Sequence, residues 1–123
     1  MTTDTIELWH QRARPFPTER DFDTQLGCHF EEFVEMLQTL DFECDGTTFE
    51  LIALIDAMNE FAGALKRGEV KARIVNRKEF LDSICDQIVT GNGAAYCAGM
   101  KPTEGLRRVN LSNWSKFNKD GQP

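Results

Sequence analysis

Apolar residues recur at steps of three and four along most of this chain, and that period constrains the fold more than any other feature. Within residues 23–40 they fall at Leu26, Phe30, Phe33, Val34, Leu37 and Leu40. This spacing gathers the side chains on one face of an amphipathic helix. Similar patterns occupy residues 47–67 and 76–99, and no stretch alternates like a strand. The sequence therefore predicts an all-α fold, most simply a helical bundle of three to five helices.

Capping residues and glycines indicate where these helices begin and end. Three polar residues each precede an acid by three positions, as capping side chains do at a helix start. The pairs are Thr18 with Asp21, Thr47 with Glu50, and Asn76 with Glu79. Gly68 and Gly99 are typical of helix C-terminal ends, where glycine adopts a left-handed conformation. Pro102 predicts the start of a short last helix that runs to Val109.

The two ends of the chain carry weaker helix signals. Pro15 and Pro17 exclude a regular helix around themselves, so we expect residues 1–17 to form an N-terminal segment that is irregular or partly helical. Residues 112–123 are mostly polar, and we expect a C-terminal tail there. A chain of 123 residues has room for one hydrophobic core. The sequence therefore predicts a single domain over residues 1–123.

Composition and charge exclude several classes of protein. The net charge is −6, with 20 acidic and 14 basic residues, which argues against binding a nucleic-acid polymer through a broad basic face. No apolar run approaches the roughly 18 residues of a membrane span. The first residues lack the basic start and apolar stretch of a signal peptide. We therefore expect a cytoplasmic protein with no membrane partner.

Small residues cluster late in the third long helix, at Gly91, Gly93, Ala94 and Ala95. A glycine in a helix interior costs about 1 kcal/mol relative to alanine. We interpret the cluster as a close contact between helices, which two copies of the chain could also make. Trp9 and Trp114 could stack on a base, but packing in a core or interface explains two lone aromatic residues more simply.

Two of the expected helices carry acidic residues beside their apolar stripes. The first set is Glu31, Glu32 and Glu35, and the second is Glu79, Asp82 and Asp86. Within each set, spacings of three, four or seven place carboxylates on one helix face. Two such faces turned toward one cleft would form an all-oxygen site suited to Mg²⁺, with Mn²⁺ as the alternative. The simpler interpretation of either face alone is a solvated acidic surface.

The same residues form an ordered set of motifs. Residues 31–35 have the form EExxE, residues 79–82 have the form ExxD, and Asp86 follows four positions later. Residues 112–116 read Ser-Asn-Trp-Ser-Lys, which is similar to an SNxSK tail, and residues 120–123 read Asp-Gly-Gln-Pro. In this order they resemble the all-α nucleotide pyrophosphohydrolases, which include MazG-like proteins, dimeric dUTPases and phosphoribosyl-ATP pyrophosphatases. The likeness is to small phage or bacterial members and covers residues 26–40 and 79–123.

The resemblance implies a Mg²⁺-dependent hydrolase that cleaves a nucleoside triphosphate to a monophosphate and pyrophosphate. The implied metal ligands are four carboxylates, Glu32, Glu35, Asp82 and Asp86. Glu31 and Glu79 are the catalytic candidates, either as the general base or as extra ligands. Asn113 and Lys116 are the implied substrate-binding residues. Relatives build the cleft from more than one chain, so a homodimer or homotetramer is expected.

One departure from the family bears on the substrate. The gap between Glu35 and Glu79 is longer than in most MazG-like proteins, and the helix expected over residues 47–67 fills it. The base and sugar preference therefore do not carry over. The alternative function is a non-catalytic helical module that binds a nucleotide or a basic protein surface through the same carboxylates.

Overall fold

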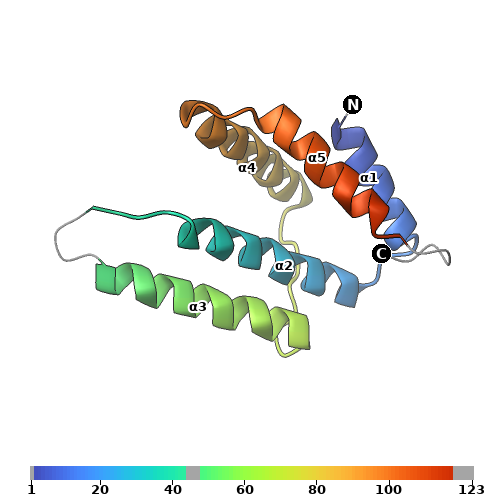
Figure 1. The fold of residues 1–123 in the computed structure, drawn as a ribbon. Helices are drawn as coiled ribbons and strands as arrows, with labels where there is room; N and C mark the ends of the chain where they lie inside the picture. The colour runs from blue at the N-terminus through green and yellow to red at the C-terminus, as the bar shows by residue number, and fades with distance from the viewer. Residues whose placement is uncertain (1, 44–47, 118–123) are drawn as a thin grey trace. The chain divides into compact units, whose positions relative to one another are not determined.

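The computed structural model describes residues 2–43 and 48–117, and it describes side chains for residues 5–43 and 50–117. Among these residues there are five helices and no strand (Figure 1). The helices are α1 (Thr2–Ala13), α2 (Glu19–Gln38), α3 (Thr48–Arg67), α4 (Arg77–Cys97) and α5 (Pro102–Ser115). The prediction of an all-α fold is therefore confirmed.

The helices belong to two compact units, and each is described by itself. One unit spans Pro17–Arg73 and contains α2 and α3. The other combines Met1–Phe16 with Ile74–Pro123 and contains α1, α4 and α5. None of the helices in the described ranges is long and apolar enough to span a bilayer. The single domain expected over residues 1–123 stays a prediction.

The N-terminal ends of α2 and α4 follow the predicted capping chemistry. The Thr18 hydroxyl accepts a hydrogen bond from the backbone N–H of Asp21, and the Asp21 carboxylate accepts one from the backbone N–H of Thr18 at 2.8 Å. At α4, the Asn76 side chain accepts from the backbone N–H of Glu79 at 3.1 Å. Each cap satisfies donors that the first helical turn leaves without a partner. The pair predicted at Thr47 lies outside the described residues.

The C-terminal ends of α3 and α4 share one glycine-based motif. Gly68 and Gly99 have φ angles of 79° and 77°. At each end two backbone N–H groups turn back to carbonyls of the last turn, as in a Schellman motif. Both positions therefore confirm the predicted helix ends. A side chain at either position would adopt a backbone conformation that residues other than glycine rarely take.

The helices at the two chain ends are longer than expected. The N-terminal segment over residues 1–17 is partly helical, because α1 occupies Thr2–Ala13 and ends before the two prolines. The last helix does not stop at Val109 but continues to Ser115, so the first residues of the expected tail at 112–123 are helical. Residues 118–123 lie outside the described part of the chain. Contacts between α1 and α5, described below, account for both extra helical segments.

The α2–α3 unit is an antiparallel helical hairpin with a narrow core (Figure 1). Val34 from α2 is 2% exposed, and Ala62 and Leu65 from α3 are 0% and 1% exposed. Gly27 lies opposite Ala62, where a Cβ atom would come within 2.8 Å of the Ala62 carbonyl oxygen. Small residues therefore allow the two helices to approach closely at this point.

Polar contacts fix the chain at the open end of the hairpin. Arg20 donates to the carbonyl oxygens of Leu65 and Lys66 at 3.1 and 2.8 Å, and so caps the C-terminal end of α3. The buried carboxylate of Asp23, 2% exposed, accepts from the backbone N–H of Ala72 at 2.8 Å. These bonds hold the segment after α3 against α2.

In the second unit, α1 and α5 pack side by side (Figure 1). Asn110 is 9% exposed and donates to the Thr5 hydroxyl at 2.6 Å. Trp9 Nε1 donates to the Asn113 carbonyl oxygen at 2.9 Å, and Trp114 Nε1 donates to the Thr5 carbonyl oxygen at 3.3 Å. Both tryptophans are thus packing residues with satisfied indole N–H groups, in agreement with the simpler of their two interpretations.

Candidate functional site

The first acidic set lies on the second half of α2, and its three carboxylates differ in their surroundings. Glu31 is half-buried beside α3, where its Oε2 lies 2.9 Å from Lys66 Nζ. The hydrogen bond with Glu31, together with its negative charge, raises the pKa of Lys66. The pair is 35% and 38% exposed, so its contribution to stability is small. A catalytic role for Glu31 would require the carboxylate to exchange Lys66 for water or metal.

Glu32 and Glu35 are exposed on α2. Neither makes a hydrogen bond or an ion pair with another described residue. Their oxygens are therefore free to accept from water or to coordinate a cation. Two unpaired carboxylates three residues apart repel each other weakly on a helix face, and a bound cation would remove that cost.

The second acidic set lies on the first half of α4, where Glu79, Asp82 and Asp86 are all exposed. Among the described residues, no ion pair or side-chain bond engages these carboxylates. Glu79 occupies the first turn of α4, where a negative charge interacts favourably with the helix dipole. The helix dipole thus explains an acid at this position without catalysis, whereas it does not explain Asp82 or Asp86.

The two acidic sets belong to different compact units, Glu31 to Glu35 in one and Glu79 to Asp86 in the other. Within the described ranges, no three His, Cys, Asp or Glu side chains gather closely enough to hold a metal ion. The donor chemistry nevertheless fits Mg²⁺, because unpaired carboxylate oxygens are the ligands it prefers. Glu32, Glu35, Asp82 and Asp86 remain the candidate ligands.

The expected substrate-binding residues lie at the C-terminal end of α5. Lys116 is the cap residue of this helix, and its Nζ lies 3.2 Å from Asn113 Oδ1. The backbone carbonyl of Asn113 accepts the indole N–H of Trp9. The structure therefore brings Asn113 and Lys116 together and ties the backbone of Asn113 to α1.

The side chains of α1 are the main feature that the sequence analysis missed. Thr5, Trp9 and Arg12 follow one another at steps of four and three, so they share one face of α1. The Arg12 guanidinium lies over the Phe117 ring, 4.5 Å from its centroid. The spacing of Thr5, Trp9 and Arg12 can be found in the sequence. Two of these three residues are polar, so they do not produce the hydrophobic period that indicates an amphipathic helix.

His10, next to Trp9, is a half-buried group on α1 whose protonation the structure disfavours. Its Nδ1 lies 3.2 Å from Arg14 Nη1. A guanidinium only donates hydrogen bonds, so Nδ1 must be the acceptor and the ring must be neutral. Burial lowers the pKa of His10 below its ordinary 6.5, and the charge of Arg14 lowers it further.

Stability should therefore fall on acidification. Below pH 6.5 the unfolded chain binds the His10 proton more readily than the folded chain does, so the free energy of unfolding decreases as the pH falls. We expect a lower Tm at pH 5 than at pH 7, and a smaller difference in His10→Gln. Thermal melts followed by circular dichroism measure both values. An identical pH dependence in the two proteins would contradict the assignment of a neutral His10.

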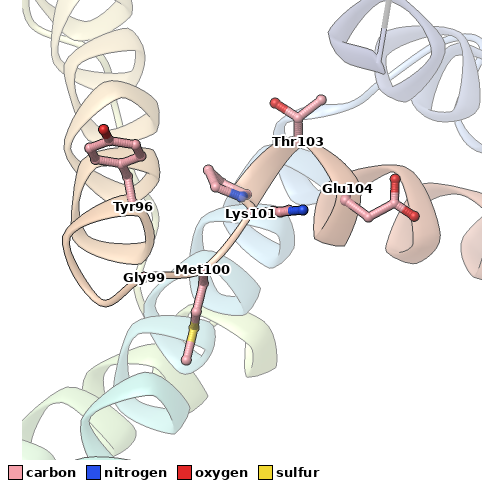
Figure 2. A pocket seen from close by; sticks show the side chains of 7 residues that line it. Tyr96, Gly99, Met100, Lys101, Thr103 and Glu104 are labelled. Carbon is pink, nitrogen blue, oxygen red and sulfur yellow. The ribbon is translucent and has the colours of Figure 1, made fainter.

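An open depression of about 800 Å³ lies where α4 turns into α5. Figure 2 shows the side chains around it. Its lining residues are Tyr96, Gly99, Met100, Lys101, Pro102, Thr103 and Glu104. Tyr96 and Met100 are 75% and 65% exposed, so the depression is shallow. Glu104 is already bonded to Arg107 and Arg108. None of the predicted site residues lines this depression, and its chemistry favours no particular ligand.

Comparison with known proteins adds no relative. No family model matches the chain, and neither a curated protein nor a solved structure matches it. The resemblance to MazG-like proteins therefore stays a prediction from the motifs in residues 31–35, 79–86 and 112–116.

Proposed function

We propose that this chain is a Mg²⁺-dependent nucleoside triphosphate pyrophosphohydrolase of MazG-like architecture, with Mn²⁺ as an alternative metal. One observation carries the proposal: the motif carboxylates Glu32, Glu35, Asp82 and Asp86 are exposed on two helices without a partner among the described residues. Glu104, by contrast, is bonded to Arg107 and Arg108 on its own helix. The free carboxylates are instead available for a cation and a phosphate chain.

The proposed reaction is attack of water on the α-phosphorus of the substrate. The new bond joins the water oxygen to that phosphorus, and the bond to the bridging oxygen breaks, so pyrophosphate leaves with the bridging oxygen. When bound by the four carboxylates, Mg²⁺ supplies charge neutralisation for the phosphate oxygens. Glu79 or Glu31 takes the proton from the attacking water as general base. Of the two, Glu79 has the free carboxylate, whereas Glu31 is bonded to Lys66.

In this proposal, Lys116 and Asn113 bind the substrate. The Lys116 ammonium contacts phosphate oxygens, and the Asn113 amide donates to the phosphate or the sugar. In the ligand-free chain these two side chains bond to each other at 3.2 Å. A phosphate oxygen can replace the Asn113 oxygen as the acceptor for Lys116 with no change in the backbone.

The proposal also includes a homodimer or homotetramer in the cytoplasm. Two helices can bury only the face that they share, and α2 and α3 leave large apolar side chains uncovered. Phe33, Leu54 and Phe61 are 46%, 49% and 49% exposed. An apolar surface of this kind on a helical hairpin is typical of an interface. Subunit contacts that cover it would also let carboxylates from more than one chain contribute to a site.

The test is release of pyrophosphate from a panel of nucleoside and deoxynucleoside triphosphates, with Mg²⁺ or Mn²⁺ and with EDTA as the control. We expect metal-dependent turnover that yields one monophosphate for each pyrophosphate. The substrate with the highest turnover identifies the preferred nucleobase. Absence of turnover across the panel, from folded helical protein with metal supplied, would contradict the hydrolase and favour the non-catalytic binding module.

A further inference from the structure

The C-terminal end of α5 is held against α1 by a compact set of polar and aromatic contacts, which we call the α1–α5 clamp. It consists of Thr5, Trp9, Arg12, Trp114 and Phe117. Trp9 and Trp114 each lie 5.5 Å from Phe117, centroid to centroid. The two indole N–H groups bond to carbonyl oxygens of the facing helix. Together these contacts fix both the register and the rotation of α5 relative to α1.

Arg12 is the charged member of the clamp, and aromatic rings hold its guanidinium in place. The Cζ atom lies 4.5 Å from the centroid of Phe117 and 5.9 Å from that of Trp114. Contact with an aromatic face uses the flat side of the guanidinium and leaves its five N–H donors at the edge. Among the described residues no carboxylate bonds to Arg12, whereas Arg107 and Arg108 both bond to Glu104.

Arg12 and Lys116 lie at the same end of the α1–α5 pair. Phe117, which supports Arg12, directly follows Lys116 in the chain, and Lys116 is bonded to Asn113. Arg12 lies in the last turn of α1 and Lys116 caps α5, so the dipole of each helix favours the cation at its own end. An anion bound at this end of the helix pair would interact favourably with both charges.

We infer that Arg12 binds the polyphosphate of the substrate together with Lys116. This inference rests on the proposed function, since it adds a residue to the same site. A guanidinium can donate two parallel hydrogen bonds to a phosphate, which an ammonium cannot, and it is less strongly hydrated. Arg12 is therefore a substrate-binding residue, and Trp9 is a positioning residue that acts through the backbone of Asn113.

The test measures binding of inorganic tripolyphosphate by isothermal titration calorimetry, which is independent of turnover. Arg12→Gln should weaken the affinity about tenfold, as expected for loss of a charge-assisted contact. Arg12→Lys keeps the charge but loses the paired donors, and we expect an intermediate affinity. Arg108→Gln removes the same charge from α5 and should change the affinity less than about twofold. Fluorescence of the two tryptophans, both in the clamp, reports whether each variant keeps the clamp intact.

Each outcome supports or overturns the inference. A tenfold loss in Arg12→Gln with unchanged tryptophan fluorescence supports phosphate binding by Arg12, and the separate turnover assay decides whether that phosphate belongs to a nucleotide substrate. Wild-type affinity in Arg12→Gln overturns it, even if the wild type releases pyrophosphate. Equal losses in Arg12→Gln and Arg108→Gln also overturn it, because they would indicate a general effect of charge. A wild type that binds no tripolyphosphate overturns it together with the phosphate-binding role of Lys116.

Discussion

Glu35→Gln and Asp82→Asn are each expected to lower pyrophosphate release by about a hundredfold or more. Each change replaces a charged oxygen donor by a neutral amide of the same shape, and metal-assisted charge stabilisation contributes several kcal/mol to such reactions. Both side chains are exposed and bond to no other described residue, so neither change removes a contact that supports the fold. Initial rates under saturating Mg²⁺, with circular dichroism to verify the helices, measure the effect.

The matched control is Asp56→Asn. Asp56 is an exposed acid on α3 that belongs to neither motif, so its replacement changes the net charge by the same amount. We expect wild-type turnover in this variant and a Mg²⁺ requirement shifted to higher concentration in the other two. Full turnover in either Glu35→Gln or Asp82→Asn would contradict the metal-ligand assignment. Equal losses in all three would indicate that net charge, rather than specific ligands, governs activity.

The sequence predicted those parts of the fold that depend on local chemistry. The starts of α2 and α4 follow from caps at Thr18 and Asn76, and the ends of α3 and α4 follow from Gly68 and Gly99. In each case the deciding hydrogen bonds join residues within one or two turns of each other. Local signals of this kind are readable from a single sequence because the partners are separated by three to five positions.

The extent of α1 was not predicted, because its stability comes from distant contacts. Trp9 bonds to a carbonyl 104 positions away in the chain, and Thr5 meets Asn110 105 positions away. The face that packs on α5 carries polar side chains, so it produces no apolar period. The nearby Pro15 and Pro17 suggested irregular chain, although they only end the helix. The contacts with α5 therefore stabilise a helix that the local sequence alone does not indicate.

The candidate site likewise combines features that local spacing predicts with features that arise only from the packing of helices. Spacing alone correctly predicted that the acids occupy α2 and α4, whereas Asn113 and Lys116 were implied by the resemblance of residues 112–116 to an SNxSK tail. Spacing did not predict that Lys66 engages Glu31, because that ion pair joins residues 35 positions apart on different helices. Contacts that form only when two helices pack together cannot be predicted from the spacing of residues in a single sequence without homologues.

The glycines show most clearly that local spacing does not reveal where helices pack closely. They also lead to the second prediction with a large expected effect, which concerns stability. The sequence favoured Gly91 and Gly93 as the point of close helix contact, yet a Cβ atom at either would meet nothing within 4 Å. The close approach occurs at Gly27, where a Cβ atom would lie 2.8 Å from the Ala62 carbonyl oxygen and 2.7 Å from Lys66 Cγ. Lys66 can move aside, but a backbone oxygen in the middle of α3 cannot.

Gly27→Ala and Gly91→Ala should therefore change the free energy of unfolding in opposite directions. We expect Gly27→Ala to lower it by about 2 kcal/mol, because overpacking forces α2 and α3 apart around Val34 and Leu65. Gly91→Ala should raise the stability of α4 by about 1 kcal/mol, the ordinary preference of a helix interior for alanine. Urea denaturation followed by circular dichroism measures both. A stabilised Gly27→Ala would mean that α2 and α3 can separate without cost, whereas a destabilised Gly91→Ala would restore the contact that the sequence favoured, as a contact between copies of the chain.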